Sequence, residues 1–142
     1  MFSAVWKKIS QGNYSSVYLL VGLEHYFFDE TIRRMKQSLN QKEETDVIVF
    51  DLDEVPVQYV IEEADTLPFF SERKLIIAKN ASFLKATEKG KEKIEHDLKA
   101  LEKWMNHQSE TAIVIFIAPY EKMDERKKIS KLMKEKAVFL EA

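Results

Sequence analysis

The sequence predicts a three-layer α/β fold in which an about five-stranded parallel sheet is covered by helices on both faces. Short apolar runs alternate along the chain with longer segments whose apolar residues recur at helical spacing. The short runs are apolar throughout and do not alternate with polar residues, which is typical of parallel strands buried on both faces. The length of 142 residues is that of one domain.

The composition excludes several classes of protein. With 45% hydrophobic and 32% charged residues, and only three glycines and three prolines, the chain is expected to fold and not to be disordered. A net charge of −2 gives no global positive field, so a contact with nucleic acid would have to be local. No cysteine is present, which fits a cytoplasmic location. We expect no secretory signal and no membrane partner, because the longest apolar run, 112–118, is far shorter than the about 20 residues that span a bilayer.

The first half of the chain predicts three helices and two strands. Apolar residues at positions 2, 5, 6 and 9 share one helical face, and Gly12 is expected to end that helix. A strand at 17–21 and a turn at Gly22 lead into a helix with apolar residues at 28, 32, 35 and 39. A second strand at 47–50 precedes a helix that Pro56 opens, with positions 57, 60, 61 and 64 on its buried side.

The second half continues the alternation. A strand at 75–78 is followed by a polar connection over 80–90 and by a helix with apolar residues at 94, 98, 101 and 105. A fourth strand is expected at 111–118. Asp124 is expected to cap a helix with buried residues at 129, 132 and 133, before a fifth strand at 138–140. The chain stops just after this strand, which suggests a fragment of a longer protein.

The turn over residues 22–28 is the first place where a nucleotide could bind, because open parallel sheets bind ligands beyond the carboxyl ends of their strands. A P-loop reads G-x-x-x-x-G-K-S/T, with lysine on the phosphates and a hydroxyl on magnesium. This turn has one glycine, Gly22, no lysine, and bulky residues at 26–28. We therefore expect a simple turn, no nucleotide site and no cofactor.

Asp51 and Asp53 follow the second strand as Asp-x-Asp, which resembles the nucleophile motif of haloacid-dehalogenase-like phosphatases. In those enzymes the first aspartate attacks phosphorus and the second handles the proton of the leaving group. Here the motif continues as Glu-Val-Pro where that family has Gly and Thr. The two carboxylates can instead complement the N-terminus of the helix that Pro56 opens. A magnesium-dependent phosphatase is the alternative function.

Other polar residues give weaker signals. His25, His96 and His107 are scattered without the spacing of metal ligands, so no metal site is predicted and surface or turn positions are expected. The stretch 122–136 is rich in lysine and arginine and could contact phosphate groups, although a solvated helix of mixed charge explains it as well. The stretch 85–103 interleaves both signs of charge, which favours pairing along a helix face.

The stretch 67–73 reads Leu-Pro-Phe-Phe-Ser-Glu-Arg and places two large aromatic residues side by side between a helix and a strand. Adjacent residues diverge by about 100° on a helix and point to opposite faces of a strand. At least one of Phe69 and Phe70 therefore tends toward solvent unless a second layer covers it. An exposed aromatic pair beside a proline is a good anchor for another protein. The residues alone support core packing and partner binding equally.

Several stretches resemble the N-terminal domain of delta subunits of bacterial DNA polymerase III, a family of clamp-loader subunits. The resemblance rests on residues 17–22 followed by Glu24, on 67–75, on Lys79-Asn80 and on 122–128. It implies a single AAA+-like domain over 1–142, similar to P-loop NTPases but with the P-loop eroded. Members are longer, which implies that a C-terminal collar, through which they assemble with the other clamp-loader subunits, is missing here.

The resemblance also implies a role for the 67–73 stretch. Leu67, Phe69 and Phe70 would insert into a hydrophobic pocket on the ring-shaped sliding clamp (the beta subunit) and favour the open ring, so that it can be loaded onto DNA. No bond is made or broken in this step, so no catalytic residue is expected, although the whole holoenzyme is a DNA-directed DNA polymerase, a nucleotidyltransferase. Contact of Lys127 or Lys128 with DNA would be weak. Glu125 stands where members carry a basic residue.

Overall fold

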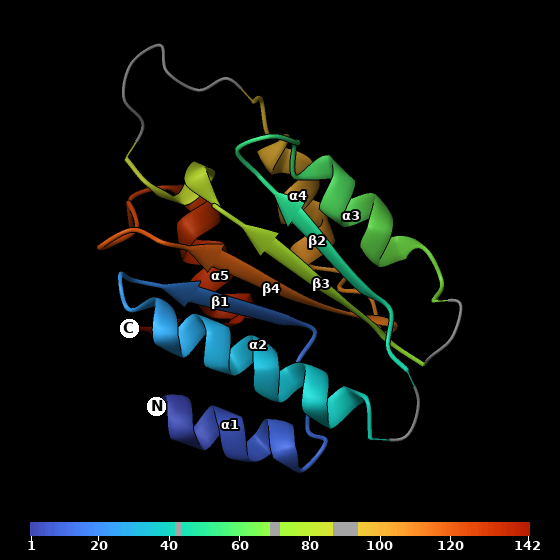
Figure 1. Cartoon of the computed structure of the whole chain (residues 1–142). Coiled ribbons are helices and arrows are strands. Elements are labelled where there is room, and N and C mark those ends of the chain that lie inside the picture. The colour runs from blue at the N-terminus through green and yellow to red at the C-terminus, as the bar shows by residue number, and fades with distance from the viewer. Residues whose placement is uncertain (42–43, 69–71, 87–93) are drawn as a thin grey trace.

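The structure, a computed structural model, describes residues 1–41, 44–68, 72–86 and 94–142. Within these residues five parallel strands form one sheet in the order β2-β3-β4-β1-β5 (Figure 1). The strands are β1 (Val17–Val21), β2 (Val47–Asp51), β3 (Lys74–Lys79), β4 (Ala112–Ala118) and β5 (Val138–Glu141). The helices in the described ranges are α1 (Phe2–Ser10), α2 (His25–Leu39), α3 (Gln58–Asp65), α4 (Leu98–Met105) and α5 (Lys128–Lys136), with a 3₁₀ turn, η1 (Ser82–Leu84).

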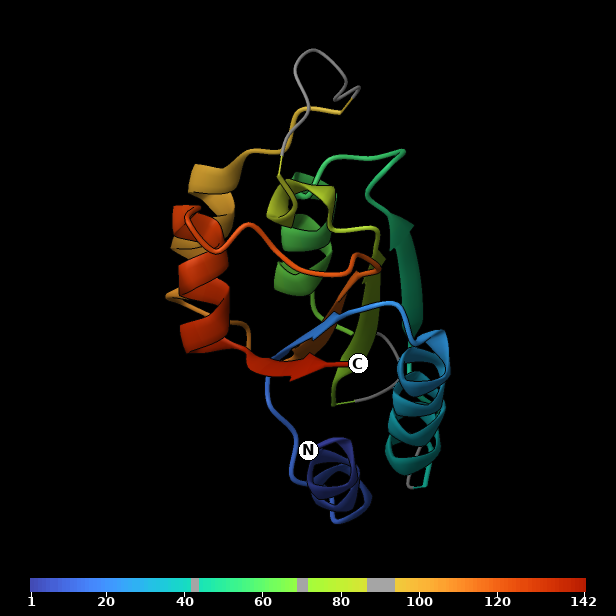
Figure 2. The same ribbon diagram turned by 90° about the vertical axis from the view of Figure 1, so that its left-hand side faces the viewer.

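The helices form a layer on each face of the sheet, which confirms the predicted three-layer α/β fold. Helices α1 and α2 cover one face, and α3, α4 and α5 cover the other (Figure 2). Successive strand residues alternate between the two layers, as the pleat of a strand requires. In β1, Tyr18 and Leu20 pack in the α1–α2 core, whereas Leu19 and Val21 pack in the opposite core. The central strands β1 and β4 are therefore buried along their whole length.

Strand β2 departs from the expected burial on both faces. It lies at the edge of the sheet, with β3 as its neighbour. Val47 and Val49 pair with Leu75 and Ile77 and so face the α1–α2 side, yet 53% of Val49 is exposed. The α1–α2 layer leaves this margin of the sheet uncovered. The apolar sequence of β2 could not predict the exposure of Val49, because the order of the strands in the sheet decides which strand lies at an edge.

Two glycines have backbone conformations that other residues adopt with strain. Gly12 has φ +78° and follows the end of α1, where the Asn13 N–H donates to the Lys8 oxygen at 2.9 Å, the arrangement of a Schellman C-cap. This confirms Gly12 as the helix stop. Gly22 has φ +137°, and a Cβ placed there would lie 1.9 Å from the carbonyl oxygen of Ala142. Gly22 is therefore a turn residue that also lets the backbone of Ala142 approach β1.

Two expectations about helix starts need correction. Helix α4 begins at Leu98 and not at Ile94, because the Asp97 side chain accepts a 3.0 Å hydrogen bond from the Ala100 N–H and caps the helix there. Asp124 does not cap α5, which begins at Lys128. Its carboxylate accepts instead from the Arg126 N–H at 3.1 Å, in the turn before the helix.

The connection after β3 is more structured than its polar sequence suggested. It contains η1, whose Phe83 and Leu84 are buried in the core of the α3–α5 side. Pro56 was expected in the first turn of the next helix. It lies instead just before Val57, the N-cap residue of α3. None of the helices formed by the described residues has the length and apolar character needed to cross a membrane.

Candidate functional site

The turn between β1 and α2 presents apolar and acidic groups where a nucleotide-binding protein would present glycines and a lysine. Leu23, Glu24 and Tyr26 are exposed. Phe28 is buried below them, and Phe27 lies 5.0 Å from the ring of Phe2 on α1. A carboxylate at the start of α2 opposes the binding of a phosphate at that position. These side chains are consistent with the expectation that the turn binds no nucleoside triphosphate. That expectation stays a prediction.

Asp51, the first residue of the Asp-x-Asp motif, is held in a hydrogen-bonded arrangement at the end of β2. Its Oδ1 accepts from Asn80 Nδ2 and from the Asp53 N–H, each at 2.9 Å. The hydrogen bond from Asn80, then that from the Asp53 N–H, and the charge of Lys79 lower the pKa of the Asp51 carboxyl. Asn80 itself has φ +61°, a conformation that asparagine tolerates better than most residues. Asp51 thus ties the ends of two strands together.

Tyr120 lies near this pair, after β4. Burial raises the pKa of Tyr120 to about 12, with smaller contributions from the negative charges of Asp53 and Asp51. In the part of the chain that the structure describes, no group of three or more histidine, cysteine, aspartate or glutamate side chains could hold a metal ion. The carboxyl ends of these strands therefore offer an anchored carboxylate and a neutral phenol.

The histidines divide into two kinds. His25 and His107 are exposed, as expected. His96 is half-buried, which corrects the expected surface position: its Nδ1 accepts a 2.9 Å hydrogen bond from the Val57 N–H at the start of α3, and its ring lies 5.3 Å from that of Phe83. Sequence reasoning missed this contact because 39 residues separate the two partners. No local pattern could have revealed it.

The basic stretch near α5 is engaged in contacts within the domain. Lys128 pairs with Glu102 at 3.2 Å, Lys134 pairs with Glu125 at 2.5 Å, and Lys127 donates to the Phe83 carbonyl oxygen at 2.9 Å. This arrangement favours the interpretation of a mixed-charge surface over that of a phosphate-binding face. It also gives Glu125 a structural partner on α5.

The 67–73 stretch follows α3 and precedes β3, so it lies at the end of the sheet where the strands begin. Leu67 is 73% exposed. Phe69 and Phe70 lie outside the described residues. The structure therefore places one of the three predicted contact residues on the surface.

Buried and half-buried polar groups fix both flanks of this stretch. Lys74, at the start of β3, donates from Nζ to Glu63 Oε2 at 2.7 Å and to the Glu63 carbonyl oxygen at 3.1 Å. Glu63 lies in the last turn of α3. Trp104 Nε1 on α4 donates to Asp65 Oδ1 at 3.3 Å. The end of one element and the start of the next are thus joined below Leu67.

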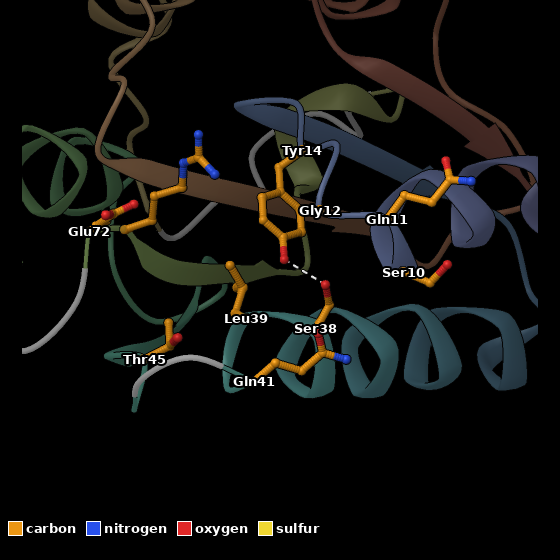
Figure 3. A pocket seen from close by; sticks show the side chains of 10 residues that line it. Ser10, Gln11, Gly12, Tyr14, Ser38, Leu39, Gln41, Thr45 and Glu72 are labelled. Atoms are coloured by element: carbon orange, nitrogen blue, oxygen red, sulfur yellow. Dashed lines mark hydrogen bonds between the residues drawn. The ribbon is translucent and has the colours of Figure 1, made fainter.

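A polar cleft of about 510 Å³ lies at the same end of the sheet, where the strands begin, and is shown in Figure 3. Its walls are the ends of α1 and α2 and the residues before β1, β2 and β3, among them Tyr14, Ser38, Thr45, Glu72 and Arg73. The hydroxyls of Tyr14 and Ser38 are 2.5 Å apart, and the Arg73 guanidinium lies 5.3 Å from the Tyr14 ring centre. Sequence analysis did not identify this cleft, because its residues come from three stretches that are far apart in the chain, 10–14, 38–45 and 72–73.

Comparisons with known proteins agree on one family. A family model described as DNA polymerase III, delta subunit, matches residues 18–142. The DNA polymerase III subunit delta of Bacillus subtilis is 44% identical over 140 residues, 97% of this chain and 40% of that protein. The solved structure of a Bacillus subtilis DNA clamp loader delta protein superposes with a TM-score of 0.92 at 40% identity, over 100% of this chain and 42% of that one.

A more distant structure shows the fold alone. A DNA polymerase III gamma subunit-related protein from Thermotoga maritima matches with a TM-score of 0.62 at 10% identity, over 99% of this chain and 45% of that chain. The predicted likeness to AAA+-like clamp-loader proteins is confirmed at the level of the fold. The phosphatase alternative based on Asp51 and Asp53 finds no support in these comparisons. The chain spans less than half the length of these three relatives.

Proposed function

The chain belongs to the DNA polymerase III delta subunit family, and on that premise we propose that it binds the sliding clamp (beta subunit) through Leu67, Phe69 and Phe70 and helps to open the ring for loading onto DNA. The observation that carries the proposal is the exposure of Leu67, which Pro68 separates from the aromatic pair in the sequence. An apolar side chain that water surrounds gains free energy when a partner covers it.

The surroundings of Leu67 support a protein partner. Productive protein interfaces combine an apolar centre with a polar rim. Glu72 and Arg73 follow the aromatic pair after Ser71 in the sequence, and they line the polar cleft at the end of the sheet where the strands begin. Leucine and two phenylalanines would provide the centre of the interface, and the groups around the cleft would provide its rim.

The mechanical step is a shift between two states of the clamp. A domain that binds the open ring more tightly than the closed ring favours opening by the difference between the two binding free energies. Such a step requires neither bond cleavage nor a cofactor in this domain. Assembly with the other clamp-loader subunits would use parts of the protein beyond this chain, and any contact of Lys127 or Lys128 with DNA would be weak.

A pair of matched leucine variants tests the proposal. Leu67→Ala removes the exposed leucine before the aromatic pair, and Leu23→Ala removes a leucine of similar exposure, 59%, at the opposite edge of the sheet. Both should leave the thermal midpoint unchanged, because neither side chain is buried. Titration of each variant against a purified bacterial sliding clamp should show weaker binding for Leu67→Ala alone. Absence of clamp binding by the parent chain, or equal losses in both variants, would contradict the proposal.

A further inference from the structure

We propose that Lys74 and Glu63, here called the Lys74–Glu63 pair, position the 66–73 segment for binding to its partner. The inference rests on the clamp-binding function proposed above. Neither side chain is expected to touch the clamp, since Lys74 is 3% exposed and points into the domain. The pair would act through the segment that it holds.

The position of Lys74 in β3 explains why its ammonium group lies inside the molecule. Its neighbour Leu75 packs in the α1–α2 core, so Lys74 points to the opposite face of the sheet, toward α3. There Nζ lies 2.7 Å from Glu63 Oε2 and 3.1 Å from the Glu63 carbonyl oxygen. One ammonium group thus contacts both the side chain and the backbone of the same helical residue.

The contact with the backbone fixes where α3 ends. The last carbonyl groups of a helix have no partner within it, and a cation at that end also interacts favourably with the helix dipole. The Glu63 carbonyl accepts from both Lys74 Nζ and the Thr66 N–H, the latter at 3.2 Å. The Thr66 hydroxyl donates to the Glu62 carbonyl at 2.9 Å, and Trp104 holds Asp65. The residue before Leu67 is therefore held by several bonds.

The energetics favour a positioning role over a stabilising one. A buried ion pair gains little net free energy, because the cost of removing both charges from water offsets their attraction. A methionine of similar length could fill the same space without that cost. What methionine cannot supply is a directional bond from the start of β3 to the last turn of α3. The pair joins the last turn of α3 to the first residue of β3.

A segment whose two ends are held in place loses less conformational entropy when a partner binds it. Ordering of side chains and loops at an interface subtracts from the binding free energy, and a preorganised segment avoids part of that loss. The pair therefore lets the apolar side chains of this segment contribute a larger share of their contact energy to binding. Its loss should weaken clamp binding even in a fully folded domain.

The test compares Lys74→Met with Lys79→Met, which removes the same charge from the exposed opposite end of the same strand. The measurements are affinity for a purified bacterial sliding clamp, the thermal midpoint, and hydrogen exchange of the Thr66 amide. We expect the folded fraction of Lys74→Met to bind roughly tenfold more weakly, its Thr66 amide to exchange faster, and its midpoint to fall, because the variant leaves the Glu63 carboxylate without its partner. Lys79→Met should match the parent in all three. In the Lys74→Met background, Leu67→Ala should weaken binding by a smaller factor than in the parent.

Each other outcome has a defined meaning. If the parent binds the clamp and Lys74→Met binds as tightly, the positioning role is wrong and the proposed function stands. If Lys74→Met melts earlier while its folded fraction binds as tightly as the parent, the pair is structural only. If the parent does not bind, both proposals fail. Should Lys74→Met fail to fold, Lys74→Gln also removes the ammonium group and keeps a polar side chain at the same position, and unchanged affinity in that variant would overturn the inference.

Discussion

The side-chain amide of Asn80 lies 2.9 Å from Oδ1 of Asp51, and this bond joins the residue after β3 to the last residue of β2. Asn80 adopts φ +61° to make it. The contact supports β2, which is the edge strand of the sheet that the described residues form. The free energy that this hydrogen bond contributes can be measured separately from the backbone strain at Asn80.

Two substitutions of Asn80 should differ in a defined order. Asn80→Gly loses the hydrogen bond but accepts the positive φ, so it should lower the free energy of unfolding by about 1 kcal/mol. Asn80→Ala loses the bond and adds strain of about 1–2 kcal/mol, so it should be the less stable of the two. Urea unfolding of both variants gives the comparison. Equal stability of the two would show that the backbone at this position is not strained.

Asp51 should make the stability of the domain depend on pH in the acid range. Its pKa is lowered in the folded state, chiefly by Asn80, so its carboxylate stabilises the fold above the ordinary aspartate value of about 3.9. That contribution is lost as the pH falls through the lowered pKa of the folded state. The stability difference between the parent and Asp51→Asn should therefore shrink between pH 5 and acid pH, as measured by urea midpoints.

The Asn80→Ala variant is the control for this titration. It removes the largest cause of the lowered pKa of Asp51 and leaves the carboxyl in place. Its stability should depend less steeply on acid pH than that of the parent. A gap between parent and Asp51→Asn that stays constant over the whole range would mean that Asp51 has the same pKa in the folded and unfolded chains.

Gly22 and Gly12 should tolerate alanine to different degrees. Both have positive φ, but a Cβ at Gly12 would meet nothing within 4 Å, whereas one at Gly22 would meet the Ala142 carbonyl oxygen at 1.9 Å. We expect Gly12→Ala to lower the free energy of unfolding by about 1 kcal/mol. Gly22→Ala should lower it by clearly more, because the backbone of β1 or of Ala142 must also move. Thermal unfolding of the two variants measures this, and equal losses would contradict the close approach.

Phe69 and Phe70 should contribute to clamp affinity and not to stability. Truncation of a buried anchor at an interface costs about 2 kcal/mol or more, roughly a thirtyfold loss in affinity. Deletion of a core phenylalanine would instead cost about 3–5 kcal/mol of folding stability. Thermal midpoint and clamp affinity measured on Phe69→Ala and Phe70→Ala separate these cases. Heavy loss of stability with unchanged affinity of the folded fraction would refute the anchor assignment.

Much of the fold could be predicted from the sequence because burial depends on local apolar spacing. The runs at 17–21 and 112–118 lie in the centre of the sheet, and continuous apolar runs predict such strands well. Helix ends were less accessible. Ile94 fits the spacing of α4 but lies before it, because the capping bond of Asp97 decides where the helix begins.

Features that depend on strand order or on distant partners could not be predicted from the sequence. The exposure of Val49 follows from the edge position of β2, and the contact of His96 with Val57 joins residues far apart in the chain. The candidate site likewise contains features that the local sequence indicates and features that depend on distant contacts. The residues of the 67–73 stretch left core packing and partner binding open, and the resemblance to the family implied the surface anchor. The Lys74–Glu63 pair required knowledge of which helix packs above the start of β3.

The uncovered margin at β2 also bears on the solubility of the domain. An apolar edge strand with open backbone groups is a template on which a second copy of the chain can pair. β2 is only five residues long, Asp46 precedes it and Asp51 is its last residue. Antiparallel pairing of two copies would bring Asp46 of one toward Asp51 of the other, and like charges oppose that approach. Two carboxylates thus oppose aggregation at an edge strand whose Val47 and Val49 side chains are exposed.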